Sequence, residues 1–253
     1  ICSPLAAIPK ADGSLRLIHD GSRPAGTNMN AYAQPPSVHY QSFDDALAYL
    51  QRGMYMCKVD LKAAYRSVKI KDSNWPATGL QWKFKGDDKV TYLIDTRLPF
   101  GASLSPHIFN TLSQAVRHII ASHSVPISGV VAYLDDFWLA AESYEECQQM
   151  LLTTIHILRR LGFAIAWDKV VSPTQRNTFL GLEICSQAMA VTLSTEKLHS
   201  FRKLLLDAVH RRALSKRQLQ SLIGKLNWIT RCVYGGRAFL RRLIDFAQPL
   251  RKP

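Results

Sequence analysis

Short stretches in which apolar and polar residues alternate predict strands over the first three quarters of the chain. The alternation has a period of two in residues 78–84 and 90–94, and the turn residues at 86–88 between them predict a hairpin. A second hairpin is predicted for residues 5–8 and 15–18, because Pro, Gly and Ser separate the two stretches. Further apolar strands are predicted at residues 54–61, 163–165 and 179–184, and a third hairpin at 130–139.

Apolar residues spaced three and four apart predict helices between and after these strands. Three helices are expected to begin with a capping box, a Ser followed three residues later by an acid or Gln. These pairs are Ser42 with Asp45, Ser143 with Glu146, and Ser215 with Gln218. Ser105 is expected to cap another helix, with Pro106 in its first position. Mixed strands and helices up to about residue 190, followed by helices alone at 198–208, 215–229 and 237–246, predict an α+β fold with an antiparallel sheet and helices on one face.

The hairpin at 130–139 interrupts apolar β-forming residues with two adjacent acids, Asp135 and Asp136. Asp is an ordinary turn residue, so a solvated turn is one interpretation. A third acid, Asp60, follows another apolar strand, and a sheet could place all three side by side. Converging carboxylates repel one another unless cations bind. Two magnesium ions about 3.5–4 Å apart would neutralise them and would stabilise the oxygens of a phosphoryl displacement.

Composition and charge predict a folded chain with a polyanionic partner. Apolar residues make up 47% of 253 residues, and no apolar run approaches the roughly 20 residues of a membrane span. The formal net charge is +13, of which +11 lies from Ser194 onward, where 14 Lys and Arg accompany three acids. This asymmetry favours nucleic-acid binding over a solvated basic face. A membrane partner is not expected, because no lipidation signal or unpaired apolar face accompanies the charge.

The cysteines and the first residues bear on the cellular setting. The five cysteines have no zinc-ligand spacing, and their number is odd, so they predict reduced thiols in an intracellular protein of the cytoplasm or nucleus. The chain begins with Ile1-Cys2-Ser3-Pro4, without Met or the pattern of a signal peptide. We therefore expect a piece of a longer polypeptide.

Six ordered motifs, within residues 4–184, resemble those of reverse transcriptases from retroelements. Tyr133-Leu134-Asp135-Asp136 matches the Tyr-x-Asp-Asp motif, and residues 59–65 match the strand that carries the first catalytic Asp and an aromatic steric gate five residues later. Residues 98–101 with Ser105-Pro106 match the loop under the nucleotide. The other matches are the fingers hairpin at 12–16 with Asn30 after it, Leu161-Gly162-Phe163 with Lys169, and the primer grip at 179–181.

This resemblance implies a right-hand polymerase fold with fingers hairpins, an antiparallel palm sheet with helices on one face, and a helical thumb. The expected parts are residues 1–53, fingers with the start of the palm; 54–72, palm; 73–98, fingers; 99–190, palm including the primer grip; and 191–253, a basic helical thumb. Phe100 is typical of gypsy-type elements, whereas residues 19–26 are more similar to DIRS-like elements.

The resemblance also implies a role for single residues in catalysis. Asp60 and Asp135 would ligate two Mg²⁺ ions, or Mn²⁺, with Asp136 and Leu61 in the same metal site. Lys169 would donate a proton to the leaving pyrophosphate; on the residues alone it could be a solvated loop lysine.

Further residues are expected to bind nucleotide and nucleic acid. The incoming dNTP would meet Lys10 and Arg16 at its triphosphate, Tyr65 at its sugar, and Phe100 and Gly101 in its pocket. The primer grip would be Phe179, Leu180 and Gly181, and the duplex contacts Arg211, Arg212, Lys216, Arg217, Lys225 and Arg231. On periodicity alone Tyr65 could belong to the core, and Phe179 and Leu180 to a sheet. The tryptophans at 82, 138, 167 and 228 are interpreted as core or strand packing.

The implied activity is RNA-directed DNA polymerisation on an RNA template with a DNA or RNA primer. The parent chain would carry further domains such as ribonuclease H. One alternative is an RNA-dependent RNA polymerase, which usually has a second acid after the first catalytic Asp, where this chain has Ala64 and Tyr65. The other is a domesticated, non-catalytic scaffold, which would gain nothing from three converging acids.

Overall fold

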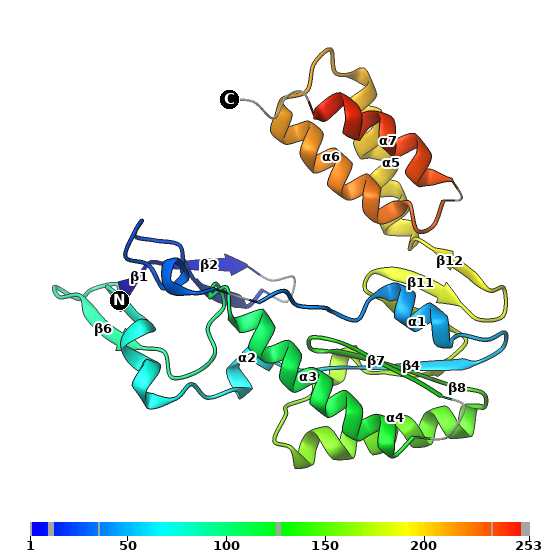
Figure 1. The fold of residues 1–253 in the computed structure, drawn as a ribbon, viewed down its shortest axis with the longest axis horizontal. Coiled ribbons are helices and arrows are strands. Elements are labelled where there is room, and N and C mark those ends of the chain that lie inside the picture. Colours follow the sequence, from blue (N-terminus) through cyan, green and yellow to red (C-terminus); the bar gives the residue numbers. More distant parts are fainter. Residues whose placement is uncertain (1, 10–12, 35, 125–127, 234, 249–253) are drawn as a thin grey trace. The chain divides into compact units, whose positions relative to one another are not determined.

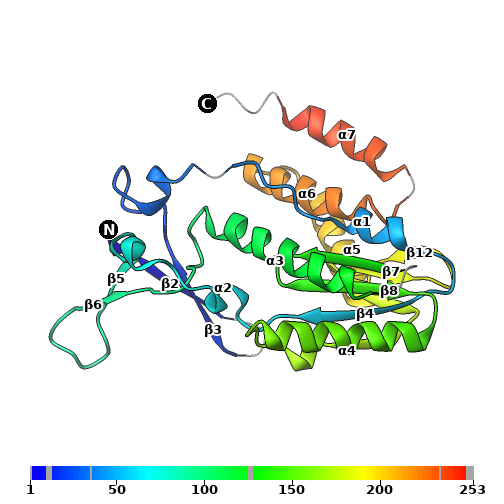
Figure 2. The same ribbon diagram turned by 60° about the horizontal axis from the view of Figure 1, so that its bottom comes forward.

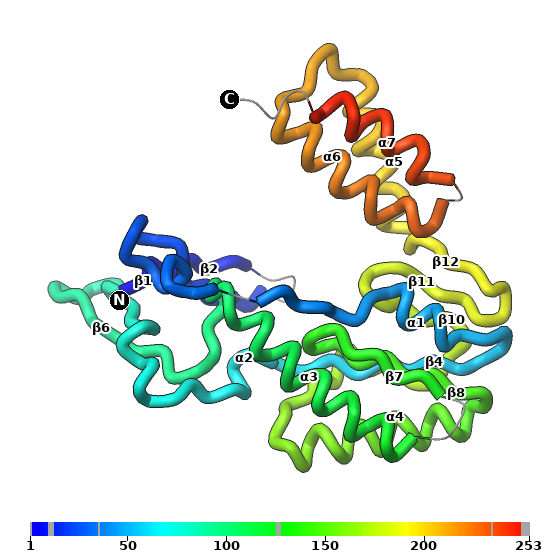
Figure 3. Tube along the Cα trace, in the orientation of Figure 1, coloured from blue at the N-terminus to red at the C-terminus, as the bar shows by residue number. Residues whose placement is uncertain are grey.

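The structure is a computed structural model, and it describes residues 2–9, 13–34, 36–124, 128–233 and 235–248. Lys10, expected at the triphosphate, lies outside the described residues. The chain divides into two compact units, residues 1–50 with 54–174, and residues 51–53 with 175–253. In Figures 1 and 3 the chain is coloured along its sequence, from blue at the N-terminus to red at the C-terminus.

A four-stranded antiparallel sheet forms the centre of the first unit. Its order is β7-β8-β4-β9. The bounds are β4 Tyr55–Asp60, β7 Ser128–Tyr133, β8 Asp136–Ala141 and β9 Val171–Thr174. The hairpin predicted at 130–139 is therefore confirmed. An isolated bridge between Leu61 and Ile165 replaces the strand predicted at 163–165, which was wrong because this segment only crosses the end of β4.

Two helices cover one face of this sheet. They are α3 (Ser105–Ser122) and α4 (Tyr144–Arg160), and Figures 1 and 2 show α4 running along the sheet beneath β4. Val59 of β4 and Phe137 of β8 belong to one buried cluster with Phe109 of α3 and Leu158 of α4. Because strand side chains alternate between faces, the neighbouring residues Lys58, Asp60 and Asp136 project from the face opposite to these helices.

The hairpins of the first unit follow the predicted pattern. β2 (Leu5–Pro9) pairs with β3 (Leu15–His19), and β5 (Gly79–Trp82) pairs with β6 (Thr91–Ile94). A short β1 (Cys2–Ser3) runs parallel to β5. The short helices are η1 Met29–Tyr32, α1 Phe43–Tyr49, α2 Ala64–Ser67, η2 Asp72–Ala77 and η3 Trp167–Lys169.

The N-termini of the helices show which of the predicted caps form. All three predicted capping boxes are present, at the starts of α1, α4 and α6. The prediction that Ser105 caps α3 was wrong. Ser105 is the first residue of the helix, and its buried hydroxyl donates to the Pro99 carbonyl at 2.7 Å. This hydrogen bond attaches the loop at 98–104 to α3.

The second unit combines a small sheet with three helices. Its strands are β10 Arg176–Phe179, β11 Leu182–Cys185 and β12 Ala190–Thr192, and its helices are α5 Thr195–His210, α6 Lys216–Ile229 and α7 Gly236–Ala247. The single strand predicted at 179–184 was wrong. It is a hairpin that turns at Leu180 and Gly181, whose φ angles are 45° and 82°.

Exposure separates the four tryptophans, among the five of the chain, for which packing was predicted. Trp138 is fully buried in β8, as predicted. Trp82 is 41% exposed but lies in strand β5, which agrees with the strand alternative of the prediction. Trp167 is 59% exposed in η3, so the prediction was wrong for this residue. Trp228 is partly buried and stacks on Phe201 within the second unit. Within the described part of the chain, no helix has the length and apolar character that a membrane crossing requires.

Candidate active site

The acidic hairpin of β7 and β8 ends in a two-residue turn, Leu134-Asp135. Leu134 has a left-handed φ of 53°, which is unfavourable for a residue with a branched side chain. Two hydrogen bonds hold this backbone in place. The Ser113 hydroxyl of α3 donates to the Leu134 carbonyl at 2.6 Å, and the Leu61 amide donates to the Asp135 carbonyl at 3.0 Å. The turn is therefore attached both to a helix and to the end of β4.

The sheet register places two of the three acids side by side. Asp60 at the end of β4 lies directly opposite Asp136 at the start of β8, and Asp135 precedes Asp136 on the turn. Asp60 is buried, with 7% of its surface exposed. Antiparallel pairing thus joins residues that are 76 positions apart in the sequence into one acidic edge.

Burial and mutual repulsion disfavour the charged forms of these acids. Burial is the main cause that raises the pKa of Asp135, and the charge of Asp60 adds to it. Burial also raises the pKa of Asp136 to about 6, against the opposing effect of Lys58. The Lys169 ammonium donates to Asp60 at 3.0 Å, and this hydrogen bond raises the pKa of Lys169. Two lysines therefore face three carboxylates.

Lys58 is a site residue that the sequence reasoning missed. Its Nζ lies 3.3 Å from Oδ1 of Asp136, and the two side chains are only 16% and 20% exposed. The signal was available: in a strand, residues two apart share a face, so Lys58 had to project beside Asp60.

We expect Lys58→Met to destabilise the metal-free protein by about 3 kcal/mol, because breaking a buried pair leaves an unpaired charge. Thermal unfolding in EDTA measures this effect. The double variant with Asp136→Asn is the matched control, since it removes both charges and should recover most of the lost melting temperature. A Lys58→Met variant as stable as wild type would show that the ion pair contributes nothing.

The carboxylate oxygens of Asp60, Asp135 and Asp136 suit a hard divalent cation. Carboxylate oxygens are the ligands that Mg²⁺ prefers, and here they are desolvated beyond what the two lysines compensate. Among the described residues, Oδ1 of Asp136 is buried and accepts no hydrogen bond, although Lys58 lies near it. No group of three or more His, Cys, Asp or Glu side chains in the described ranges already has the arrangement of a metal centre.

The expected nucleotide residues form one continuous stack. The Arg16 guanidinium carbon lies 5.3 Å from the centre of the Phe100 ring, and Phe100 stacks on Tyr65 at 4.8 Å between ring centres. Tyr65 also contacts Phe109 of the core at 5.3 Å. Burial raises the pKa of Tyr65 to about 12, so its hydroxyl remains protonated at neutral pH. The described residues thus bring Arg16, Phe100 and Tyr65 together.

The backbone at Gly101 fits only glycine. Its φ is 105°, and the position that a Cβ would take is filled by the His19 carbonyl. Asn30 secures the same loop, because its side chain donates to the Gly101 carbonyl at 3.0 Å and accepts from the Ser103 amide at 2.8 Å. The loop is therefore fixed against residues 19–30.

An ion-pair cluster around the buried Asp95 joins three segments near this loop. Asp95 Oδ2 lies 3.1 Å from His19 Nε2 and 2.6 Å from Arg66 Nη1. Burial alone would raise the pKa of Asp95, but hydrogen bonds from His19 and Arg66 hold it well below its usual range. Sequence patterns gave no signal for this cluster, since its members lie in three separate segments: β3, α2 and the residue after β6.

The expected primer-grip residues occupy different environments. Phe179 is fully buried, so its side chain belongs to the core of the sheet, which was the alternative to a primer contact. Leu180 and Gly181 form the turn between β10 and β11. The expected duplex contacts are all exposed residues of α6 or of the segments beside it: Arg211, Arg212, Lys216, Arg217, Lys225 and Arg231.

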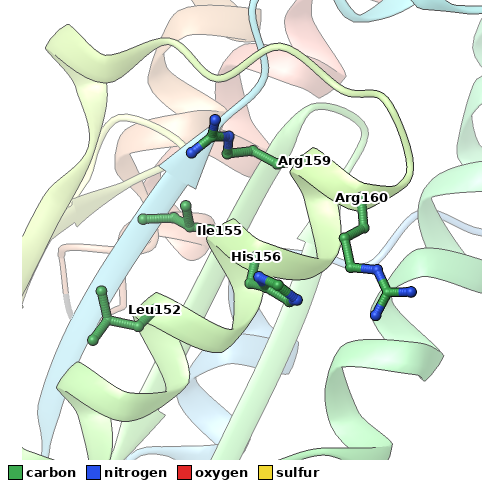
Figure 4. A pocket seen from close by; sticks show the side chains of 5 residues that line it. All are labelled: Leu152, Ile155, His156, Arg159 and Arg160. Carbon is green, nitrogen blue, oxygen red and sulfur yellow. The ribbon is translucent and has the colours of Figure 1, made fainter.

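A shallow hollow lies on α4 of the first unit. It is lined by Leu152, Ile155, His156, Arg159 and Arg160, and Figure 4 shows the two guanidinium groups pointing in different directions. All five residues come from a helix that packs on the sheet face opposite to Asp60. The hollow therefore lies outside the candidate site.

Residues 8–184 match the family model described as reverse transcriptase (RNA-dependent DNA polymerase). This chain belongs to the reverse transcriptase family. It is 25% identical over 248 residues to the Pro-Pol polyprotein of Simian foamy virus type 1, covering 98% of this chain and 19% of that protein. The Gag-Pol polyprotein of Rous sarcoma virus subgroup B (strain Schmidt-Ruppin) is 27% identical over 246 residues, 90% of this chain and 13% of that protein. The chain thus spans about a fifth or less of the length of these reverse transcriptase relatives.

Solved structures of reverse transcriptases share the fold. The foamy viral protease-reverse transcriptase dRH in complex with double-stranded DNA superposes with a TM-score of 0.71 and 23% identity, covering 90% of this chain and 36% of that chain. The foamy viral enzyme in complex with an RNA/DNA hybrid gives a TM-score of 0.68 and 20% identity, covering 99% and 33%. The predicted right-hand polymerase fold is therefore confirmed.

Proposed function

We propose that this chain is the polymerase part of a reverse transcriptase, which copies a primed RNA template with dNTPs. The observation that carries the proposal is the register of β4 and β8, which pairs Asp60 with Asp136 beside Asp135 on the turn. Phosphoryl transfer depends on positioning and charge neutralisation more than on acid–base side chains. The buried Asp60 and the half-buried Asp135 and Asp136, close to the stack of Arg16, Phe100 and Tyr65, would supply both.

Asp60 and Asp135 would hold two Mg²⁺ ions, or Mn²⁺, with Asp136 and Leu61 completing the site. Divalent ions are used generally in the reverse transcriptase family. When bound, they neutralise the charge that develops on the attacking and leaving oxygens. Lys58 offsets the charge of Asp136, to which it is paired. Lys169, whose ammonium is paired with Asp60, is 56% exposed, and it would donate a proton to the departing pyrophosphate.

The nucleotide would lie against the aromatic stack. Arg16 and Lys10 would bind the triphosphate, since guanidinium and ammonium groups pair with phosphate oxygens. Phe100 and Gly101 would shape the pocket floor, and Tyr65 would exclude a ribose 2′-hydroxyl. This arrangement favours deoxynucleotides and argues against an RNA-dependent RNA polymerase.

We expect Tyr65→Ala to admit ribonucleotides, raising the efficiency of GTP relative to dGTP by about 100-fold, a typical limit for rejecting one added hydroxyl by packing. Single-nucleotide extension with each substrate measures the ratio. Tyr65→Phe is the matched control, because it keeps the ring on Phe100 and should keep the discrimination. An unchanged ratio in Tyr65→Ala would mean that Tyr65 is only a core residue.

The basic residues of the second unit would bind the primer–template duplex. Their exposure supports this role, as does the excess of +11 from Ser194 onward. The foamy viral relatives of similar fold are in complex with double-stranded DNA and with an RNA/DNA hybrid. Contacts of this kind follow phosphates with little reading of bases.

Primer extension on an RNA template decides among the functions. We expect the chain to add dNTPs in the presence of Mg²⁺ or Mn²⁺. A preference for ribonucleotides would instead identify an RNA polymerase. Tight binding of primer–template without extension by either nucleotide would support the non-catalytic scaffold.

We also propose a retroelement setting for the chain. Phe100 and residues 19–26 favour a gypsy-type or DIRS-like element. The relatives are polyproteins, which supports a parent chain with further domains such as ribonuclease H. All five cysteines are free, which supports an intracellular location in the cytoplasm or nucleus.

A further inference from the structure

One contact in the second unit joins the turn between β10 and β11 to two helices. Lys197 of α5 donates from Nζ to the Gly181 carbonyl at 2.8 Å. The same ammonium lies 4.8 Å from the centre of the Trp228 ring on α6, and that ring stacks on Phe201 of α5. A single charged group therefore contacts the turn and α6 from its position on α5.

Lys197 differs from the other basic residues of this region. Twelve Lys and Arg are described between residues 195 and 248; eleven of them are exposed, and Lys197 alone is partly buried. A carbonyl acceptor and an aromatic face both compensate a partly desolvated ammonium. Lys197 is thus held inside the unit, apart from the exposed basic surface that would meet phosphates.

The backbone of the turn needs external support. Leu180 has a φ of 45° and Gly181 a φ of 82°, and a left-handed Leu persists only where its surroundings hold it. The position that a Cβ would take at Gly181 is filled by Lys197 Nζ, with the Trp228 ring beside it. The turn thus lies in direct contact with the ammonium and the ring, and a larger residue would separate them.

We propose that Lys197 is a positioning residue that fixes the Leu180-Gly181 turn against α5 and α6. The turn that would hold the primer end and the helices that would hold the duplex then move together. This inference rests on the proposed function, because the turn can position a primer only in a chain that extends one. Lys197 acts through the Gly181 backbone and does not bind the primer phosphates.

Lys197→Met tests the proposal, because methionine keeps an apolar stem of similar length and removes the donor and the charge. We expect about tenfold fewer nucleotides added per binding event, the effect of losing one charge-assisted hydrogen bond. The KM for the incoming dNTP should stay unchanged, since the nucleotide pocket lies in the first unit. Lys197→Arg retains a donor that stacks on aromatic rings and should recover most of the loss. Wild-type processivity in Lys197→Met would overturn the proposal.

Salt dependence separates positioning from phosphate binding. Lys225→Met, on α6, removes one of the proposed phosphate contacts and should lower the slope of log Kd against log salt concentration by about 0.9. Lys197→Met should leave this slope as in wild type. An equal fall in the slope for Lys197→Met would show that Lys197 itself binds phosphate, and would overturn the proposal.

Hydrogen exchange in the free protein tests the contact without any activity. We expect Lys197→Met to speed exchange of the amides at 180–183 and to leave those of β7 and β8 unchanged. Equal exchange in both proteins would refute the support of the turn by Lys197. If this difference is seen but the wild type extends no primer, the proposed function and the positioning role are both wrong, and the contact is purely structural.

Discussion

Asp135→Asn should lower primer extension by at least about a thousandfold, the loss expected when charge stabilisation at a transition state is removed. The amide cannot neutralise a bound cation as the carboxylate does. Asp135 is also the only acid in the two-residue turn Leu134-Asp135. Binding of primer–template should remain close to that of wild type, because the expected duplex contacts lie elsewhere in the chain. Single-turnover extension and equilibrium binding measure the two effects separately.

Two comparisons make this result specific to the site. Asp88→Asn removes the same charge from an exposed position near the turn between β5 and β6, and should extend primers as wild type does. In EDTA, Asp135→Asn should melt no lower than wild type, because it removes a charge that burial disfavours. Extension by Asp135→Asn at a rate near that of wild type would remove Asp135 from the metal site.

Gly101→Ala should be the most destabilising single-methyl change in the nucleotide pocket. The added Cβ would overlap the His19 carbonyl, and the φ of 105° is strained for any L-residue with a side chain. Backbone strain and overpacking together cost about 3 kcal/mol or more. The Phe100 carbonyl accepts a hydrogen bond from the His19 amide. A shift of the loop away from His19 would therefore also displace the Phe100 ring. We expect a lower melting temperature and a higher KM for dNTPs.

Gly86→Ala is the matched control for this change. Gly86 has a φ of 94°, similar to that of Gly101, but its Cβ position is open space. The control therefore reports backbone strain alone, and the difference between the two variants reports the overlap with His19. Equal melting temperatures and equal KM values would show that the loop can move away from His19 without cost.

Local signals in the sequence predicted the elements whose causes are local. Each capping box is set by two residues three positions apart, and all three formed. The hairpin of β5 and β6 formed around its Gly86 turn for the same reason. In contrast, β9 was not predicted, because its Pro173 weakens the strand pattern. Proline is tolerated there because β9 lies at the edge of the sheet.

Features that depend on distant residues could not be predicted in this way. The turn at Leu180 was missed because leucine does not signal a left-handed backbone, which here depends on a lysine 17 positions later. The ion pairs of Asp95 with His19 and Arg66 join segments that only the folded chain brings together. The acids themselves were recognised from motifs, whereas Lys58 required knowledge of the strand face.

The first turns of α3 set the geometry of the site, because three residues of this one helix contact its separate parts. Ser105 holds the Pro99 loop, Phe109 contacts Tyr65, and Ser113 holds the turn beside Asp135. These three residues lie four positions apart, so about 12 Å of one helix connects the sugar pocket to the acidic edge. The separation between Tyr65, which is expected at the sugar of the nucleotide, and the acidic turn is therefore set by a single rigid helix.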